Sequence, residues 1–287
     1  MNDELLTRLV ERVESRFYGK YRAFVVDNAD PEKRGRLRVK VPSVLGDEVV
    51  SGWALPCAPY GGAPDEGFFF IPPTGAGVWV EFEAGNLEYP VWVGAFWSKP
   101  GGEPETPKIN AADGSKQDTQ HPPTRKILKT QKGHTLQFED ADDDEMILLV
   151  EAKNGHVVSL NKDGIKTTDG ANGHEVFLDS SGVTVTDGVN GGNKITLSSG
   201  GVTVEDKNGN KITMGAGSVE IVSTSIKLGG AAAIEPMVLG LQFQMAVQQF
   251  LTMLATHTHV GNLGAPTSPP VTPMLLNVPL SAKHKVE

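Results

Sequence analysis

The sequence of 287 residues has almost no cysteine, no long apolar run and fewer basic than acidic residues. Its single cysteine, Cys57, excludes a disulfide within the chain, and with it the disulfide-stapled class of small secreted domains. No stretch approaches 18 consecutive apolar residues, so no transmembrane helix is expected. The first residues, MNDELLTRLVERVESRF, are acidic and mixed, and they predict no secretory signal peptide. We therefore expect a chain made in the cytoplasm without a signal peptide.

The composition indicates many turns and a thin core. Hydrophobic residues make up 39% of the chain, below the roughly 45–50% that is usual when glycine is counted with them. Glycine is common, with 33 residues, and the formal net charge of -9 disfavours an overall basic face for nucleic acid or an anionic membrane.

The first segment, residues 1–19, is predicted to contain an amphipathic helix. Apolar side chains at helical spacing within residues 3–17 include Leu5, Leu9, Val13 and Phe17, and acidic and basic residues lie between them. Two interpretations stay open for this stripe: the helix caps its own domain, or it docks on a partner.

Residues 20–98 change to the pattern of short strands. Runs such as YRAFVVDN, GRLRVKVP and GVWVEFEAG are rich in β-branched and aromatic residues and are separated by Asp-Pro, Pro and Gly-Gly turns. Five or so strands at this spacing suit a small closed barrel such as an OB-fold. All four tryptophans, Trp53, Trp79, Trp92 and Trp97, fall in this segment, where we expect them to fill the core.

Residues 99–130 are rich in proline, glycine and charge, which predicts a linker or an extended wrap.

Residues 131–235 then repeat a unit of strand, glycine-containing turn and strand. The units begin at Gly133, Gly155, Gly173, Gly192 and Gly209. Such an array has units that cannot bury an apolar face alone. Three chains winding about one axis would close that face and remove exposed sheet edges.

The apolar residues of one unit illustrate the pattern. In HEVFLDSSGVTVTD, the side chains of Val176, Leu178, Val183 and Val185 are predicted to point to one side. The array loses its charges towards its end, which suggests a narrowing structure, and residues 237–255 then carry a helical apolar pattern. A His-x-His, a Pro-rich turn and a last apolar run complete the tip region, 236–287.

The motifs of residues 22–97 resemble one known family. DNADPEKRGRLRVKVPS, WALPCAPYGG and FFIPPTGAGVWVEFEAGNLEYPVWVGAFW are similar to the OB-fold of the central spike of contractile tails. That family is also called phage baseplate assembly protein V, and it is related to the VgrG spikes of type VI secretion. The glycine-punctuated repeats, HTH and PTSPP follow in the family's order but match it more loosely.

The resemblance implies an all-β homotrimer: an N-terminal helix, an OB-fold barrel, an intertwined triple-stranded β-helix needle and a short helical or irregular tip. Three OB-folds would form a collar under the tail hub protein, and the needle would pierce the target cell envelope when the sheath contracts. The expected location is a virion tail baseplate or an assembled injection particle. Some members carry a lysozyme domain where this chain has only residues 99–130, so no enzyme activity is expected. Whether a separate small tip protein caps the needle stays open.

His257 and His259 are the candidate metal ligands. In an extended strand, residues two apart point the same way, so both imidazoles would aim at one point. Three chains would then supply six nitrogens, which suit an octahedral first-row metal such as iron(II) in a structural site. Family spikes carry such a site, and the resemblance supports iron here. The alternative is a surface pair without metal, and on a helix the two side chains would diverge by about 200°.

Competing interpretations of the chain come from other classes. It can be read as an OB-fold nucleic-acid binder with a stalk, which the net charge disfavours, or as an enzyme or a β-solenoid adhesin. The acidic run at 140–145 is expected to be a solvated loop, because it lacks the glycine of an EF-hand. The remaining histidines are expected at the surface or at repeat edges: His121, His134, His156, His174 and His284.

Overall fold

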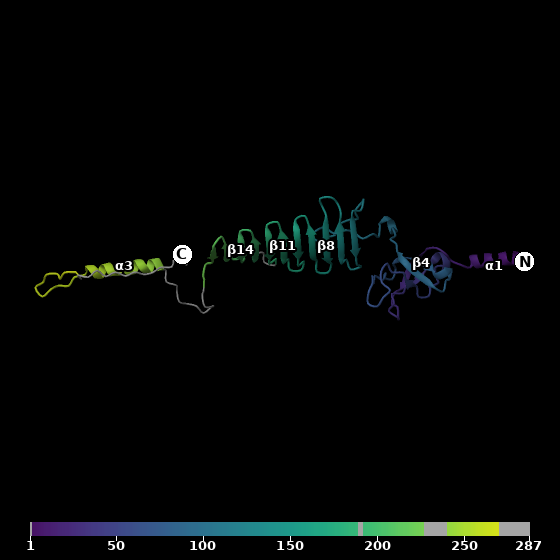
Figure 1. The fold of residues 1–287 in the computed structure, drawn as a ribbon, viewed down its shortest axis with the longest axis horizontal. Coiled ribbons are helices and arrows are strands. Elements are labelled where there is room, and N and C mark those ends of the chain that lie inside the picture. Colours follow the sequence, from purple (N-terminus) through teal and green to yellow (C-terminus); the bar gives the residue numbers. More distant parts are fainter. Residues whose placement is uncertain (1, 189–191, 227–239, 270–287) are drawn as a thin grey trace. The chain divides into compact units, whose positions relative to one another are not determined.

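A computed structural model describes residues 2–188, 192–226 and 240–269 (Figure 1). The chain is mostly β-strand, with three α-helices among the described residues: α1 (Asn2–Glu14), α2 (Pro42–Leu45) and α3 (Gly240–Thr256). Two short 3-10 turns, η1 (Glu83–Gly85) and η2 (Pro100–Gly102), complete the helical elements of this part. By its contacts the chain divides into two units, and residues 208–212 and 219–287 form the smaller one.

The first sheet is a closed five-stranded barrel. Its strands are β1 (Tyr21–Asp27), β2 (Arg38–Lys40), β3 (Leu55–Pro56), β4 (Gly77–Phe82) and β5 (Pro90–Ala95), in the order β2-β1-β4-β5-β3. The two end strands meet where the backbones of Leu37 and Ala54 exchange hydrogen bonds of 3.0 and 2.7 Å. This closure removes the sheet edges and gives the OB-like barrel that the strand pattern predicts.

The barrel has a complete core of its own. Alternate residues of β4 point inward, so Val78, Val80 and Phe82 are buried while the residues between them are only partly covered. Of the four tryptophans only Trp92 lies in this core, where its indole N–H donates to the Gly35 carbonyl at 3.1 Å. The expectation for Trp97 was wrong: it lies just beyond β5 and is 66% exposed.

A charged turn braces the loop between β1 and β2. The Asp30 carboxylate accepts hydrogen bonds from the Arg36 guanidinium at 2.7 Å and from the backbone N–H groups of Glu32 and Arg34. The Arg36 hydrogen bond is the main reason that the pKa of Asp30 lies well below its usual range. The Asp-Pro and Gly-Arg motifs of this loop therefore serve to fix the path of the backbone.

Helix α1 ends at Glu14, earlier than the expected helix at residues 3–17. Phe17 lies beyond the helix, and its backbone N–H donates to the Gly85 carbonyl at 2.9 Å. Its ring packs edge-on against Phe82, with 6.3 Å between the centroids. Phe17 therefore contributes to the barrel core and is separated from the helical stripe.

The second sheet has eleven strands that follow one another in chain order (Figure 1). They are β6 (Arg125–Lys129), β7 (Thr135–Glu139), β8 (Met146–Glu151), β9 (His156–Asn161), β10 (Gly164–Thr168), β11 (Glu175–Asp179), β12 (Gly182–Thr186), β13 (Lys194–Ser198), β14 (Gly201–Glu205), β15 (Lys211–Gly215) and β16 (Ser218–Val222). Each neighbouring pair from β6 to β14 is antiparallel. The repeats of the sequence are the hairpins of this meander.

Glycines at the starts of strands let successive turns stack closely. Gly182 has a φ of +140°, and a Cβ there would lie 1.9 Å from the Leu197 carbonyl oxygen. Gly164 and Gly201 repeat the arrangement, with a Cβ 2.0 Å from the carbonyl oxygens of Leu178 and Met214 respectively. No side chain fits at these positions, which explains why the repeat keeps a glycine at its turn.

The expected linker, 99–130, is partly ordered on the second sheet. β6 already begins at Arg125, and Ile109 and Asn110 are buried. Gln137, which is fully buried on β7, binds both backbone groups of Asn110: its Oε1 accepts from the N–H at 2.9 Å, and its Nε2 donates to the C=O at 2.8 Å. We call residues 106–120 the strap, since they cover one face of the first strands of the sheet.

The tip region contains α3 followed by a short hairpin-like loop. The helix covers residues 240–256, close to the predicted helical stretch 237–255. The predicted narrowing end of the array lies largely in residues 227–239, outside the described residues, as does the last apolar run in 270–287.

Candidate assembly face and metal site

One face of the second sheet carries an uninterrupted ladder of aliphatic side chains. The strand register places Leu178 opposite Val183 and Val176 opposite Val185, so the four residues predicted to point together do share a face. The ladder runs from β6 to β14 through cross-strand pairs, with one step along β9 from Val158 to Leu160: Leu128, Leu136, Leu149, Val158, Leu160, Ile165, Leu178, Val183, Leu197 and Val202.

The described residues leave this face uncovered. Leu149 is 53% exposed and Leu197 is 44% exposed, although both lie in the middle of strands. Burying one such aliphatic side chain completely stabilises a protein by about 1.5–3 kcal/mol, so each half-exposed residue leaves roughly 1 kcal/mol unrealised. A contiguous apolar surface of this kind marks an interaction surface.

The opposite face of the same sheet has another character. On β12 to β14 it is lined by Thr184, Thr196 and Thr203, which lie opposite one another across the strands. Where the strap covers β6 and β7, this face instead buries Arg125 against Glu139. Burial would raise the pKa of Glu139, but hydrogen bonds from Thr124 and Arg125 outweigh it and lower the pKa. This face is thus polar on β12 to β14 but buries Met146, Leu148, Val150 and Val157 on β8 and β9. The other face carries the aliphatic ladder and is not covered by the described residues.

The two candidate metal ligands lie just beyond the end of α3. The helix ends at Thr256, so His257 and His259 do not have the 200° divergence of helical neighbours. Their rings are 5.1 Å apart between centroids and nearly perpendicular. The backbone N–H of His259 donates to the Thr267 Oγ1 at 2.9 Å, and the N–H of Thr267 donates to the His259 carbonyl at 2.7 Å. These bonds fix the backbone of His259 in the loop.

The donor set of this pair suits a shared metal but is incomplete in one chain. The Nδ1 of His257 contacts the Leu254 carbonyl oxygen, which leaves Nε2 as its free nitrogen. One chain therefore offers two imidazoles, and the described residues contain no group of three or more potential ligands. A closed site here needs further nitrogens from other copies of the chain, as the six-histidine hypothesis requires.

Three other histidines form a series that the sequence only partly revealed. His156 and His174 each place Nδ1 3.0 Å from a carboxylate, of Asp169 and Asp187 respectively. His134 lies 3.9 Å from Glu151 in the equivalent place. Their recurrence after the unit glycine predicted a repeat position, and the signal for the partner was the acidic residue near the end of the same unit. Each histidine is tied to its own hairpin, and none joins the pair at the tip.

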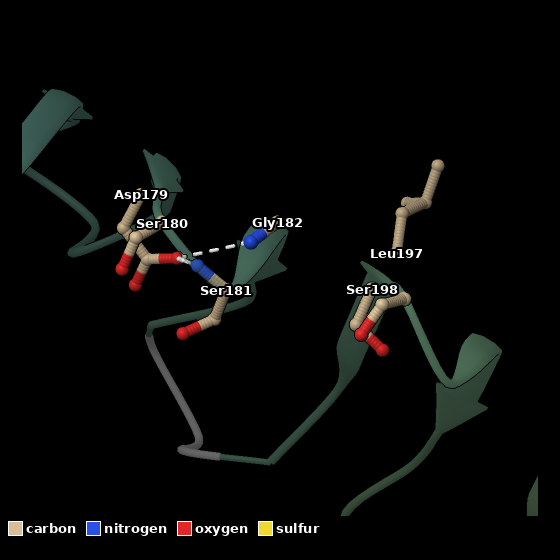
Figure 2. Close-up of a pocket in the computed structure, with 7 residues that line it drawn as sticks. Asp179, Ser180, Ser181, Gly182, Leu197 and Ser198 are labelled. Atoms are coloured by element: carbon tan, nitrogen blue, oxygen red, sulfur yellow. Dashed lines mark hydrogen bonds between the residues drawn. The ribbon is translucent and has the colours of Figure 1, made fainter.

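A shallow pocket between two neighbouring turns offers no reactive group. Figure 2 shows its lining: Asp179, Ser180, Ser181, Gly182, Leu197, Ser198 and Ser199. The Asp179 carboxylate accepts hydrogen bonds from the backbone N–H groups of Ser181 and Gly182, at 2.7 and 3.1 Å. That carboxylate therefore stabilises its turn, and the pocket has neither a histidine nor a cysteine beside its serines.

The docking residues predicted near the N-terminus separate into two groups. Leu9 and Val13 lie on α1 and are 52% and 66% exposed, so the chain's own barrel does not cover them. Phe17 packs on the barrel instead, and the side chain of Leu5 lies outside the described side chains. The exposed stripe agrees better with docking than with capping, and docking stays a prediction.

Within the part of the chain that the structure describes, no helix is both long and apolar enough to cross a bilayer.

No curated protein matches the chain. Residues 21–97, less than a third of the chain, match the family described as the Type VI secretion system/phage-baseplate injector OB domain. The matched residues are the closed barrel, from the start of β1 to just beyond β5. Residues 21–97 therefore form an OB domain of the kind found in type VI secretion and phage-baseplate injectors.

Proposed function

We propose that this chain is the central spike of a contractile tail or contractile injection system, a homotrimeric needle that punctures the target envelope when the sheath contracts. The OB domain would form a three-fold collar beneath the tail hub protein. The second sheet of each chain would contribute one part of an intertwined triple-stranded β-helix. The role is structural, without an enzymatic step.

The observation that carries this proposal is the uncovered aliphatic ladder of the second sheet. Its residues are paired in register from Leu128 to Val202 and stay partly exposed in the single chain. Two further copies of the same ladder are the natural cover, because identical repeats bring identical aliphatic layers to the same level. The threonine-bearing face would then meet solvent.

The mechanism of puncture is mechanical. Sheath contraction supplies the force, and a fully hydrogen-bonded β prism transmits it along its length without buckling. Exposed Leu9 and Val13 on α1 offer an apolar contact for the hub protein. A small tip protein remains a possible further partner at the other end, and the target envelope is a transient one.

The function is tested in assembled particles. Contractile particles purified from the organism that encodes the chain should contain it together with the sheath and tube proteins, at three copies per particle by quantitative mass spectrometry. Leu197→Asp, on the aliphatic face, should be absent from particles and abolish killing or injection. Its neighbour Thr196→Asp, on the opposite face, is the matched control and should assemble. Particles that lack the wild-type chain, or that accept Leu197→Asp normally, would contradict the proposal.

We also propose that three copies of His257 and His259 hold one structural iron(II) at the tip. Six imidazole nitrogens fill an octahedral shell and leave no open position, so the metal would tie three chain ends together. The 5.1 Å separation of the two rings, at a place beyond the helix end, supports both rings sharing one ion.

Elemental analysis of protein purified without chelator or affinity tag tests the metal. We expect one iron for every three chains, with loss of the iron in His257→Ala and in His259→Ala. His174→Ala removes a histidine of similar exposure that is paired with Asp187, and it should retain the iron. Metal-free wild-type protein, or one ion per chain, would exclude the six-histidine site and leave the spike proposal intact.

A nucleic-acid-binding role finds little support in the barrel. Arg22 on β1 lies over the rings of Trp79 and Phe96, at 5.7 and 6.0 Å from their centroids, so this outer aromatic cluster is engaged by its own cation. The net charge of -9 would also oppose binding to a polyanion.

A further inference from the structure

Helix α3 presents an apolar stripe that the described residues do not bury. Phe243, Val247, Phe250 and Leu254 lie on one side of the helix, in the alternating spacing of four and three residues that is typical of a coiled coil. None of them is buried, and Phe250 is 61% exposed. The opposite side is uncharged and mixed: it carries Gln248, Gln249, Thr252 and Thr256 together with the exposed Leu241 and Met245.

The stripe leads directly to the histidine pair. The next position in the same spacing, three residues after Leu254, is His257. The Nδ1 of His257 contacts the Leu254 carbonyl oxygen, which holds the imidazole on the last turn of α3. The apolar stripe and His257, the first proposed metal ligand, are therefore successive positions of the same spacing.

The charge pattern of this region indicates what covers the stripe. No Asp, Glu, Lys or Arg occurs between Glu235 and Lys283, in a chain of which 21% is charged. Parallel copies of one helix bring identical residues to the same level, where any charge near the seam would face its own kind and repel it. A helix in a protein also owes most of its stability to the packing of its apolar face, so the seam of α3 needs a cover.

We propose that α3 forms a parallel three-helix coiled coil with the α3 helices of two other copies, with Phe243, Val247, Phe250 and Leu254 in the seam. The bundle continues the seam to His257 and so brings one His257 from each copy to the common axis. This inference rests on the homotrimer of the proposed function and adds the element that aligns the three chain ends. Four seam layers fit within the helix, whose 17 residues span about 25 Å at about 1.5 Å per residue.

Cysteine cross-linking in the full-length chain tests the seam. Cys57 is exposed and is first replaced by serine, which leaves no other thiol. Val247→Cys is a nearly volume-conserving change in the seam, and Thr252→Cys is its matched control on the far side of the same helix. Under mild oxidation with diamide, Val247→Cys should give a disulfide-linked dimer band on a non-reducing gel, while Thr252→Cys should give only monomer.

Two further variants keep the test decisive if Val247→Cys disturbs the helix. Phe250→Cys, one seam layer further on, should also cross-link, and His257→Cys should do so if the seam continues to the histidine. Cross-linking at Thr252 equal to that at Val247, or no cross-link at either Val247 or Phe250, would overturn the coiled coil. An unlinked His257→Cys beside linked seam variants would overturn the placement of His257 on the axis.

The native mass of the uncross-linked variants separates this inference from the proposed function. A trimeric mass with unlinked seam cysteines would refute the coiled coil alone and point to a tip protein or a lipid surface as the cover of α3. A monomeric mass of wild-type protein would refute the homotrimer and the coiled coil together.

Discussion

The two sheets of this protein bury their apolar side chains to different extents. The barrel closes on itself through the Leu37–Ala54 contact, and its inward residues, such as Val80, are fully buried. The second sheet is an open meander whose aliphatic ladder stays half-exposed, as at Leu149. The barrel thus buries its core within one chain, whereas the aliphatic face of the meander stays open, and we propose that two further copies of the chain cover it. Intrinsic fluorescence separates the two sheets, because all four tryptophans lie in the barrel segment.

The largest expected effect comes from a charge placed on the uncovered ladder. Val185→Asp would bury an unpaired carboxylate in each copy of the assembled needle, at a cost of several kcal/mol per ion. We expect the native mass to fall to that of one chain while tryptophan emission stays native, because the barrel is complete in itself. Thr184→Asp, on the opposite face, should keep the mass of the wild type. A Val185→Asp protein of unchanged mass would mean that the ladder is not an interface.

The next-largest effect is expected from a substitution in the core of the barrel. Leu37 is fully buried, and Leu37→Ala should lower the free energy of unfolding of the barrel by about 2–5 kcal/mol through lost burial and a cavity. Urea unfolding followed by tryptophan emission should show the shift, and the midpoint should not depend on protein concentration. A concentration-dependent midpoint would indicate that the barrel, too, is completed by other copies.

A smaller and local effect is expected at the stacked turns of the meander. Gly182→Ala would bring a Cβ to 1.9 Å from the Leu197 carbonyl oxygen, so the β12 hairpin must shift. Gly209→Ala has a comparable positive φ but no atom within 4 Å, and it should cost only about 1 kcal/mol from backbone strain. Thermal unfolding followed by far-UV circular dichroism should rank Gly182→Ala clearly below Gly209→Ala. Equal midpoints would show that the turns tolerate displacement.

The smallest effect concerns the pH dependence of the barrel. The pKa of Asp30 is lowered by Arg36, so its contribution to stability is fully present above the unfolded value near 3.8 and is lost as the pH falls towards the folded value. Asp30→Asn lacks this contribution at every pH. Wild type should therefore exceed the variant in stability by a constant amount at neutral pH, and the difference should shrink below about pH 4. A difference that is the same at pH 7 and pH 2.5 would argue against the ion pair.

Sequence patterns predicted the elements whose structure follows from nearby residues or from a repeat. The short β-branched and aromatic runs between Asp-Pro, Pro and Gly-Gly turns indicated the barrel, and the glycine-punctuated units indicated the hairpins. The shared direction of Val176, Leu178, Val183 and Val185 is confirmed by the register. These features follow from short-range spacing, which a single sequence records directly.

The details that the patterns missed depend on distant contacts. Phe17 continues the helical spacing of α1 but leaves the helix because its backbone binds Gly85 and its ring packs on Phe82. The sequence left residues 99–130 open between a linker and an extended wrap, because the burial of the strap depends on later strands, through Gln137, Thr135 and Lys129. At the tip, the helical pattern left the direction of the two histidines open. The end of α3 at Thr256 removes that ambiguity for the pair within one chain.

The most direct test of this account is the native mass of the full-length chain, measured by light scattering over a range of concentrations. The account predicts about three times the chain mass of 30.6 kDa, held down to low concentration by the shared aliphatic core. A mass of one chain, with the ladder still folded and exposed, would contradict the central claim that two further copies cover the second sheet.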